Sequence, residues 1–81
     1  MEYNTTSKTI LITGVAGLLG SRLADWFAEH TNDEIIGVDD LSGGYIDNVH
    51  RKVQFHQFDL ADNSKLEKLF EATNPDIVYH F

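Results

Sequence analysis

Cysteine is absent from this 81-residue sequence, and several other residue types are scarce. Without a thiol the chain forms neither a disulfide framework nor a thiolate zinc site, which fits a reducing compartment. Six lysines and arginines stand against 13 acids, and the net charge is −7. This balance disfavours binding to nucleic-acid phosphates and to anionic membranes. No apolar run approaches the roughly 20 residues that a membrane span needs.

The remaining composition is that of a small folded domain. Apolar residues make up 42% of the chain, which is ordinary for a globular protein and argues against disorder. The first segment, 1–8, is a polar leader without the apolar core of a signal peptide. We therefore expect a soluble, cytoplasmic protein whose single folded unit covers residues 9–81.

In the first half of the chain, short β-branched runs flank a helical pattern. Thr9–Thr13 predicts a buried strand, and Ile35–Val38 predicts a second one. Between them, apolar residues recur at spacings of three and four and predict a helix with one apolar stripe, which ends at the polar segment 31–33. The members of that stripe are Leu19, Leu23, Trp26 and Phe27.

The second half repeats the alternation after a polar loop, 39–51, in which we expect one weak helical turn near 46–49. The alternating pattern of 53–58 predicts a strand near a sheet edge. A helix follows, with capping residues between Asp62 and Ser64, a Ser64-x-x-Glu67 capping box, and an apolar face. Pro75 ends that helix and precedes a last strand, 76–81. The apolar face consists of Leu66, Leu69 and Phe70.

Strands that alternate with helices in this way predict an α/β fold with a parallel sheet and right-handed crossovers. Three glycines, Gly14, Gly17 and Gly20, join the first strand to the first helix. A dinucleotide pyrophosphate needs a sharp turn there, a close approach of the backbone and tight packing of the helix, and these three positions suit those needs in that order. The pyrophosphate then lies on the free amides of the helix N-terminus.

An acid at the end of the second strand strengthens this interpretation. Asp39 follows Gly20 by about 20 residues, the distance expected of a carboxylate that binds the adenosine ribose hydroxyls. Its charge repels a 2′-phosphate, so NAD is favoured over NADP. Each feature also has a plain structural explanation: a tight strand-to-helix turn without a ligand explains the glycines, and a solvated turn acid explains Asp39.

The segment Lys8–Gly20, with its GxxGxxG spacing, resembles the opening of extended short-chain dehydrogenases/reductases, the NAD-dependent nucleotide-sugar epimerase/dehydratase family. Val38–Ser42 is similar to the acidic segment of that family after its second strand, and Phe58–Leu60 to its adenine-side segment. The segment 76–81 is similar to its fourth strand. The resemblance implies a partial Rossmann fold, a four-stranded parallel sheet in the order 3-2-1-4 with helices on its faces, and it makes 9–81 the first half of an NAD-binding domain, truncated at the fourth strand.

The resemblance also implies roles for individual residues. The pyrophosphate would lie against the glycine turn, the ribose beside the acids after the second strand, and the adenine beside the segment after the third. Phe81 would begin the loop that reaches the nicotinamide half. The implied cofactor-binding residues are Gly14, Gly17, Leu18, Leu19, Gly20, Asp39, Asp40, Ser42, Gly43, Asp59, Leu60 and Phe81.

The catalytic Tyr-x-x-x-Lys of that family has no counterpart here. The residues four positions after Tyr3 and Tyr45 are Ser7 and Val49, and Tyr79 has none. We therefore expect no catalytic residue in this chain, a nucleotide-sugar substrate only in an intact relative, and weak NAD affinity for the chain alone. The alternative is a stand-alone, non-catalytic nucleotide-binding or interaction module whose exposed fourth strand pairs with another chain.

The histidines and large aromatic residues do not indicate a metal site or a second binding site. His30, His50, His56 and His80 are scattered without the spacing of metal ligands, so no metal site is expected. We expect His80 to be a packed residue of the last strand, and Trp26, with its neighbour Phe27, to belong to the core.

Overall fold

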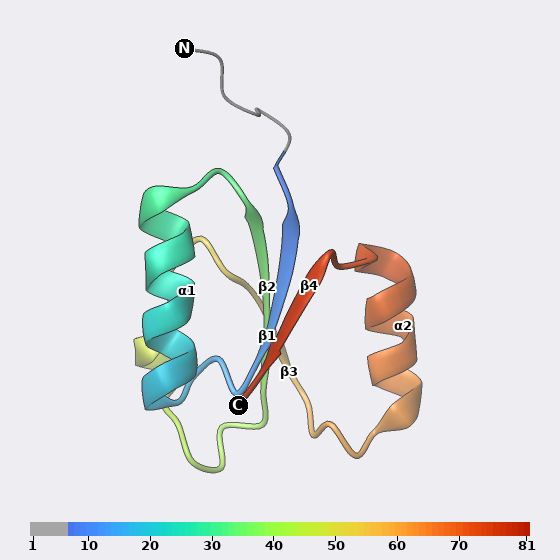
Figure 1. Cartoon of the computed structure of the whole chain (residues 1–81). Coiled ribbons are helices and arrows are strands. Elements are labelled where there is room, and N and C mark those ends of the chain that lie inside the picture. The colour runs from blue at the N-terminus through green and yellow to red at the C-terminus, as the bar shows by residue number, and fades with distance from the viewer. Residues whose placement is uncertain (1–6) are drawn as a thin grey trace.

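The computed structural model describes residues 7–81, and the order of its elements is the one predicted from the sequence (Figure 1). Each expected strand and helix is present, with bounds that differ by a few residues at most. The elements are β1 (Thr9–Thr13), α1 (Leu18–His30), β2 (Glu34–Asp39), the 3₁₀ turn η1 (Ile46–Asn48), β3 (Gln54–Gln57), α2 (Asn63–Thr73) and β4 (Ile77–His80).

The strands form one four-stranded parallel sheet in the order β3-β2-β1-β4, which confirms the predicted partial Rossmann fold. Helix α1 covers one face of the sheet and α2 covers the other (Figure 1). The alternating segment lies at the edge, as its pattern predicted, because among residues 7–81 β3 pairs only with β2. Since all strands run in one direction, their carboxyl ends meet at one end of the sheet, where the loops that follow β1, β2 and β3 gather (Figure 1).

The two central strands are buried on both faces, as their continuous apolar runs predicted. On the α1 side, Ile10, Ile12 and Ile35 pack in one cluster with two alanines of the helix. On the α2 side, Leu11 and Ile36 pack with the helix residue Leu69. Alternate residues of each strand therefore serve opposite layers, and α1 and α2 are both held by β1 and β2.

The buried face of α1 consists of small residues, and the predicted apolar stripe is only half correct. Leu23 and Phe27 pack against the core. Trp26 is wrong as a core residue, because 51% of its surface remains exposed, and Leu19, which the resemblance assigned to the cofactor, is 63% exposed. The helix lies close to the sheet, so small side chains occupy the contact line and the larger ones lie beside it. The buried residues of α1 are Gly20, Ser21, Ala24 and Ala28.

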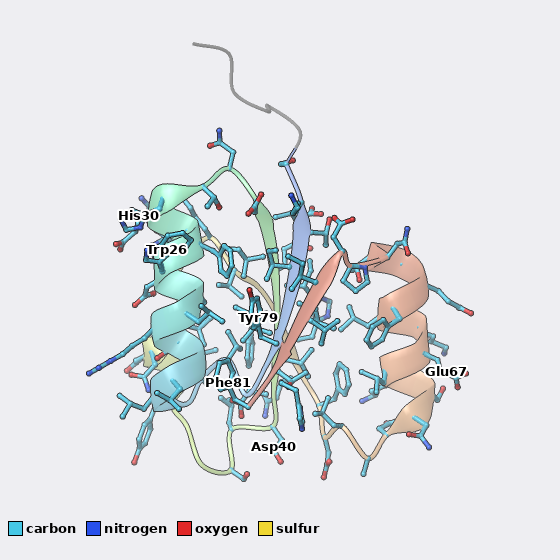
Figure 2. The ribbon with its side chains drawn as sticks, viewed as in Figure 1. Trp26, His30, Asp40, Glu67, Tyr79 and Phe81 are labelled. Carbon is cyan, nitrogen blue, oxygen red and sulfur yellow. The ribbon has the colours of Figure 1, made fainter. Side chains whose placement is uncertain are left out.

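Trp26 instead lies on the outer side of α1 with His30 (Figure 2). The two rings are stacked, with centroids 5.0 Å apart. Phe27 points inward and meets Tyr79 of β4 at 5.9 Å between ring centroids. The helical period thus located the helix correctly. It wrongly included Trp26 in the face that packs on the sheet.

The caps of α2 differ in detail from the prediction. Asp62 is the N-cap and accepts a hydrogen bond from the amide of Lys65 at 3.2 Å, so the Ser64 capping box is wrong. Asn74 closes the helix in the left-handed conformation, directly before Pro75. Leu69 is buried as predicted, but Phe70 is wrong as a core residue because 38% of it is exposed. Within residues 7–81, neither helix is long and apolar enough to cross a membrane.

Candidate functional site

The turn after β1 has the conformation that its first glycine predicted. Gly14 has a φ of 71°, which is disfavoured for residues with a β-carbon. Its amide donates to the carbonyl of Val38 at 2.8 Å, so the turn is fixed to the end of β2. A β-carbon on Gly14 would also lie 3.0 Å from the carbonyl oxygen of Phe81. The turn therefore lies between the ends of β2 and β4.

Gly20 allows helix α1 to begin directly against this turn. A β-carbon at position 20 would lie 2.2 Å from the carbonyl oxygen of Gly14 and 3.0 Å from the Cα of Val15. The close contact predicted for this glycine exists, but it is made with the turn and not with the sheet. Any larger residue would push the first turn of α1 away from the end of β1.

The N-terminus of α1 is open. Gly17 is the N-cap, and within residues 7–81 no side chain caps this end and no acid occupies its first turn. A β-carbon on Gly17 would meet only the carbonyl oxygen of Gly14, at an ordinary 3.4 Å. The fold itself thus does not require a glycine here, and the uncapped amides favour an anion.

Asp39 lies at the end of β2 and binds two main-chain amides. Its Oδ2 accepts from the amide of Ala16 at 2.9 Å, and its Oδ1 accepts from the amide of Leu41 at 2.8 Å. Each carboxylate oxygen has a second lone pair. The group therefore anchors the glycine turn and can still accept hydrogen bonds from a ligand hydroxyl.

The neighbouring acid, Asp40, is exposed and bound to Ser42. Its Oδ1 accepts from the amide of Ser42 at 2.9 Å and from the hydroxyl at 2.7 Å. These hydrogen bonds hold the pKa of Asp40 below its ordinary value. Asp39 and Asp40 thus both bring a carboxylate to the hollow at the end of β2.

These elements enclose one hollow of about 490 Å³ at the carboxyl end of the sheet. All the residues assigned to the cofactor by the sequence line it, although they come from four separate segments of the chain. Figure 2 shows Asp40 and Phe81 at this end of the molecule. The lining residues are Gly14, Gly17, Leu18, Leu19, Gly20, Val38, Asp39, Asp40, Ser42, Gly43, Phe58, Asp59, Leu60 and Phe81.

Sequence reasoning missed four residues at or beside this hollow. Val38 and Phe58 line it, and each directly precedes an assigned acid at the end of its strand. Gly44 and Asn48 do not line it but lie against the backbone of Ala16 in the glycine turn. The pair of adjacent glycines was a signal for a close approach there, but no pattern distinguished Gly44 from Gly43.

His80 lies in β4 but is exposed there, so the prediction of a packed residue is wrong, although its ring bonds to Thr13. The Thr13 hydroxyl and His80 Nδ1 are 2.6 Å apart, and 4% of Thr13 is exposed. The pair joins the ends of β1 and β4 next to Gly14. In the part of the chain that the structure describes, no cluster of histidines and acids could hold a metal ion.

Comparison with known proteins agrees with this geometry. Residues 10–81 match the model of the NAD dependent epimerase/dehydratase family. The chain belongs to that family. It is similar to UDP-glucose 4-epimerase from Streptococcus mutans, with 39% identity over 74 residues that cover 89% of this chain and 22% of that protein.

Solved structures of the family superpose closely on the fold. A UDP-glucose 4-epimerase from Thermotoga maritima, solved with UDP-glucose, gives a TM-score of 0.87 at 34% identity over 90% of this chain and 23% of that one. The enzyme from Brucella ovis in complex with NAD gives a TM-score of 0.84 at 31% identity over 93% of this chain and 22% of that one. The chain therefore spans less than a quarter of these relatives.

Proposed function

We propose that residues 9–81 are the first half of the NAD-binding domain of a nucleotide-sugar epimerase or dehydratase. One observation carries this proposal: every residue assigned to the cofactor lines a single hollow between the open N-terminus of α1 and the carboxylate of Asp39. The similar enzyme from Brucella ovis was solved in complex with NAD, and the one from Thermotoga maritima with UDP-glucose.

The glycines of the hollow fit a bound dinucleotide. Gly14 and Gly20 are explained by the contacts of the fold itself. Gly17 and Gly43 are not: a β-carbon would meet one atom at an ordinary distance at position 17 and nothing within 4 Å at position 43. Both line the hollow, where a β-carbon would occupy space that a ligand needs. A ligand that approaches the backbone closely accounts for these two positions.

The residues of this chain would hold the adenosine and pyrophosphate half of NAD. The amides at the start of α1 would bind the pyrophosphate, and Asp39 would accept hydrogen bonds from the ribose hydroxyls. In an enzyme of this kind, bound NAD supplies reversible hydride acceptance from a sugar hydroxyl. We assign no catalytic residue to residues 9–81, and the nucleotide-sugar substrate belongs to the proposal for the whole enzyme.

A titration of the ¹⁵N-labelled chain with NAD and NADP tests this proposal. We expect saturable shifts at the amides of Gly17, Leu18 and Leu19, with a dissociation constant for NAD that is roughly millimolar, equivalent to ~4 kcal/mol. NADP should bind more weakly, because its 2′-phosphate would approach Asp39 and Asp40. Equal affinity for the two dinucleotides, or shifts confined to other parts of the chain, would contradict the assignment.

A second candidate function follows from the free edge of β4. Within residues 7–81 this strand is the last of the sheet, and its apolar residue Val78 is 46% exposed. An exposed parallel edge with apolar residues is a template for another strand. If the chain acts as an interaction module, sedimentation should show self-association at micromolar concentration that Val78→Lys abolishes. A monomer at all concentrations would contradict this role for the chain alone.

A further inference from the structure

Ala16 lies inside the glycine turn and is fully buried, and both of its backbone polar groups are bound by the end of β2 and the segment after it. Its amide donates to Asp39, as described above. Its carbonyl oxygen accepts from the amide of Tyr45 at 3.2 Å and from the side-chain Nδ2 of Asn48 at 3.0 Å. Asn48 belongs to η1, so a side chain from a separate element reaches back to the turn.

The bound carbonyl belongs to the peptide that leads into α1. The other end of this peptide is the amide of Gly17, which donates to the carbonyl of Gly14 at 3.1 Å. Gly17 is also the N-cap of α1. The orientation of the Ala16–Gly17 peptide therefore sets the direction in which the next amides, those of Leu18 and Leu19, face the hollow.

Gly44 permits this contact by its lack of a side chain. A β-carbon there would lie 2.4 Å from the carbonyl oxygen of Ala16 and 2.9 Å from the amide nitrogen of Gly17. At the adjacent Gly43 a β-carbon would meet nothing within 4 Å. The two loops therefore approach each other at Gly44 closely enough for Asn48 to reach the peptide.

We propose that Asn48 is a positioning residue of the pyrophosphate subsite and acts through the Ala16–Gly17 peptide. This inference rests on the proposed function of the hollow. Asn48 does not line the hollow, so its effect on a ligand is indirect. The side-chain amide donates to a buried carbonyl that has lost access to water, and the turn cannot rotate while that bond is made.

Ligands that differ only in their phosphates separate this role from a purely structural one. ADP contacts both the ribose side and the amides of α1, whereas adenosine contacts only the ribose side. Replacement of a side chain that orients the peptide before α1 should therefore weaken the binding of ADP and leave the binding of adenosine unchanged. A side chain that merely supports the fold should affect the binding of both ligands in the same proportion.

The test exchanges two neighbouring side chains. The double variant Asp47→Asn, Asn48→Asp keeps the composition and net charge but sets a carboxylate against the Ala16 carbonyl in place of a donor. Asp47→Asn alone is the control, because Asp47 is exposed and outside the hollow. By ¹⁵N titration we expect the double variant to bind ADP about tenfold more weakly and adenosine less than about twofold more weakly. The control should bind both ligands as the parent chain does.

The milder variant Asn48→Ala provides a second test if the double variant does not fold. It leaves the Tyr45 amide as the remaining donor, so we expect about a threefold loss for ADP and faster hydrogen exchange at Gly17 in the free protein. Equal losses for ADP and adenosine, or no loss in either variant, would overturn the inference. If the parent chain binds adenosine and ADP with equal affinity, the pyrophosphate subsite itself is wrong and the proposed function fails before Asn48 is considered.

Discussion

Gly20→Ala is expected to lower the free energy of unfolding by more than about 3 kcal/mol, the upper range for overpacking a buried contact. The added β-carbon would lie 2.2 Å from the carbonyl oxygen of Gly14. Because the atoms that it would meet belong to the backbone, no flexible side chain can move aside to relieve the clash. Alanine normally favours helices, so helix propensity alone predicts the opposite sign. Thermal and urea denaturation followed by circular dichroism measure the effect.

Gly17→Ala is the matched variant at the same helix entry. Its β-carbon meets only an ordinary contact, so the protein should stay folded with a loss within about 1 kcal/mol, as for an N-cap exchange. Its binding of ADP should nevertheless fall, because the new methyl group enters the hollow. If Gly20→Ala were as stable as Gly17→Ala, the close contact between α1 and the turn would be wrong.

Asp39→Ala is expected to have the second-largest effect, since it acts on stability and on binding together. Removal of the carboxylate leaves the amide of the fully buried Ala16 without its acceptor, which costs about 1–3 kcal/mol. The ribose acceptor is lost at the same time, so the shifts caused by NAD at Gly17 to Leu19 should require at least about tenfold more ligand. Denaturation and the ¹⁵N titration measure the two effects separately.

Asp39→Asn distinguishes the two roles of this side chain. An amide keeps one acceptor oxygen and replaces the other with a donor, so one of the two main-chain bonds, to Ala16 or to Leu41, must break. We expect a smaller loss of stability than in Asp39→Ala. The preference for NAD over NADP should narrow, because one negative charge near the ribose is gone. An unchanged preference would show that Asp39 does not face the 2′ position.

The fold could be predicted from the sequence because it depends on local patterns, and the residues that the resemblance assigned to the cofactor line one hollow. The buried run 9–13 and the glycines after it define a strand and a turn without knowledge of the rest of the chain. Asp39 ends β2 and Asp59 comes shortly after β3, and the carboxyl ends of parallel strands meet at one edge. The topology then brings these segments around one hollow.

The residues that were misplaced or missed are those whose surroundings depend on how closely separate elements approach each other. Trp26 lies on the apolar stripe of α1, yet the helix is too close to the sheet for an indole ring on its contact line. Asn48 is an unremarkable polar loop residue in sequence, and only the tertiary structure brings its amide to Ala16. Gly44 differs from Gly43 only through a neighbour 28 positions away in the chain, Ala16.

The central position of β1 has a consequence for the order of folding. β1 pairs with β2 and with β4, and its threonines bond to partners 67 residues later, Thr9 to Asp76 and Thr13 to His80. Such distant pairing brings a large loop-closure entropy into the barrier and slows folding. During synthesis the first strand emerges long before its last partner, so one edge of β1 stays open until β4 arrives. The apolar run at Ile10 to Ile12 is then the segment at which a chaperone or a second nascent chain would bind.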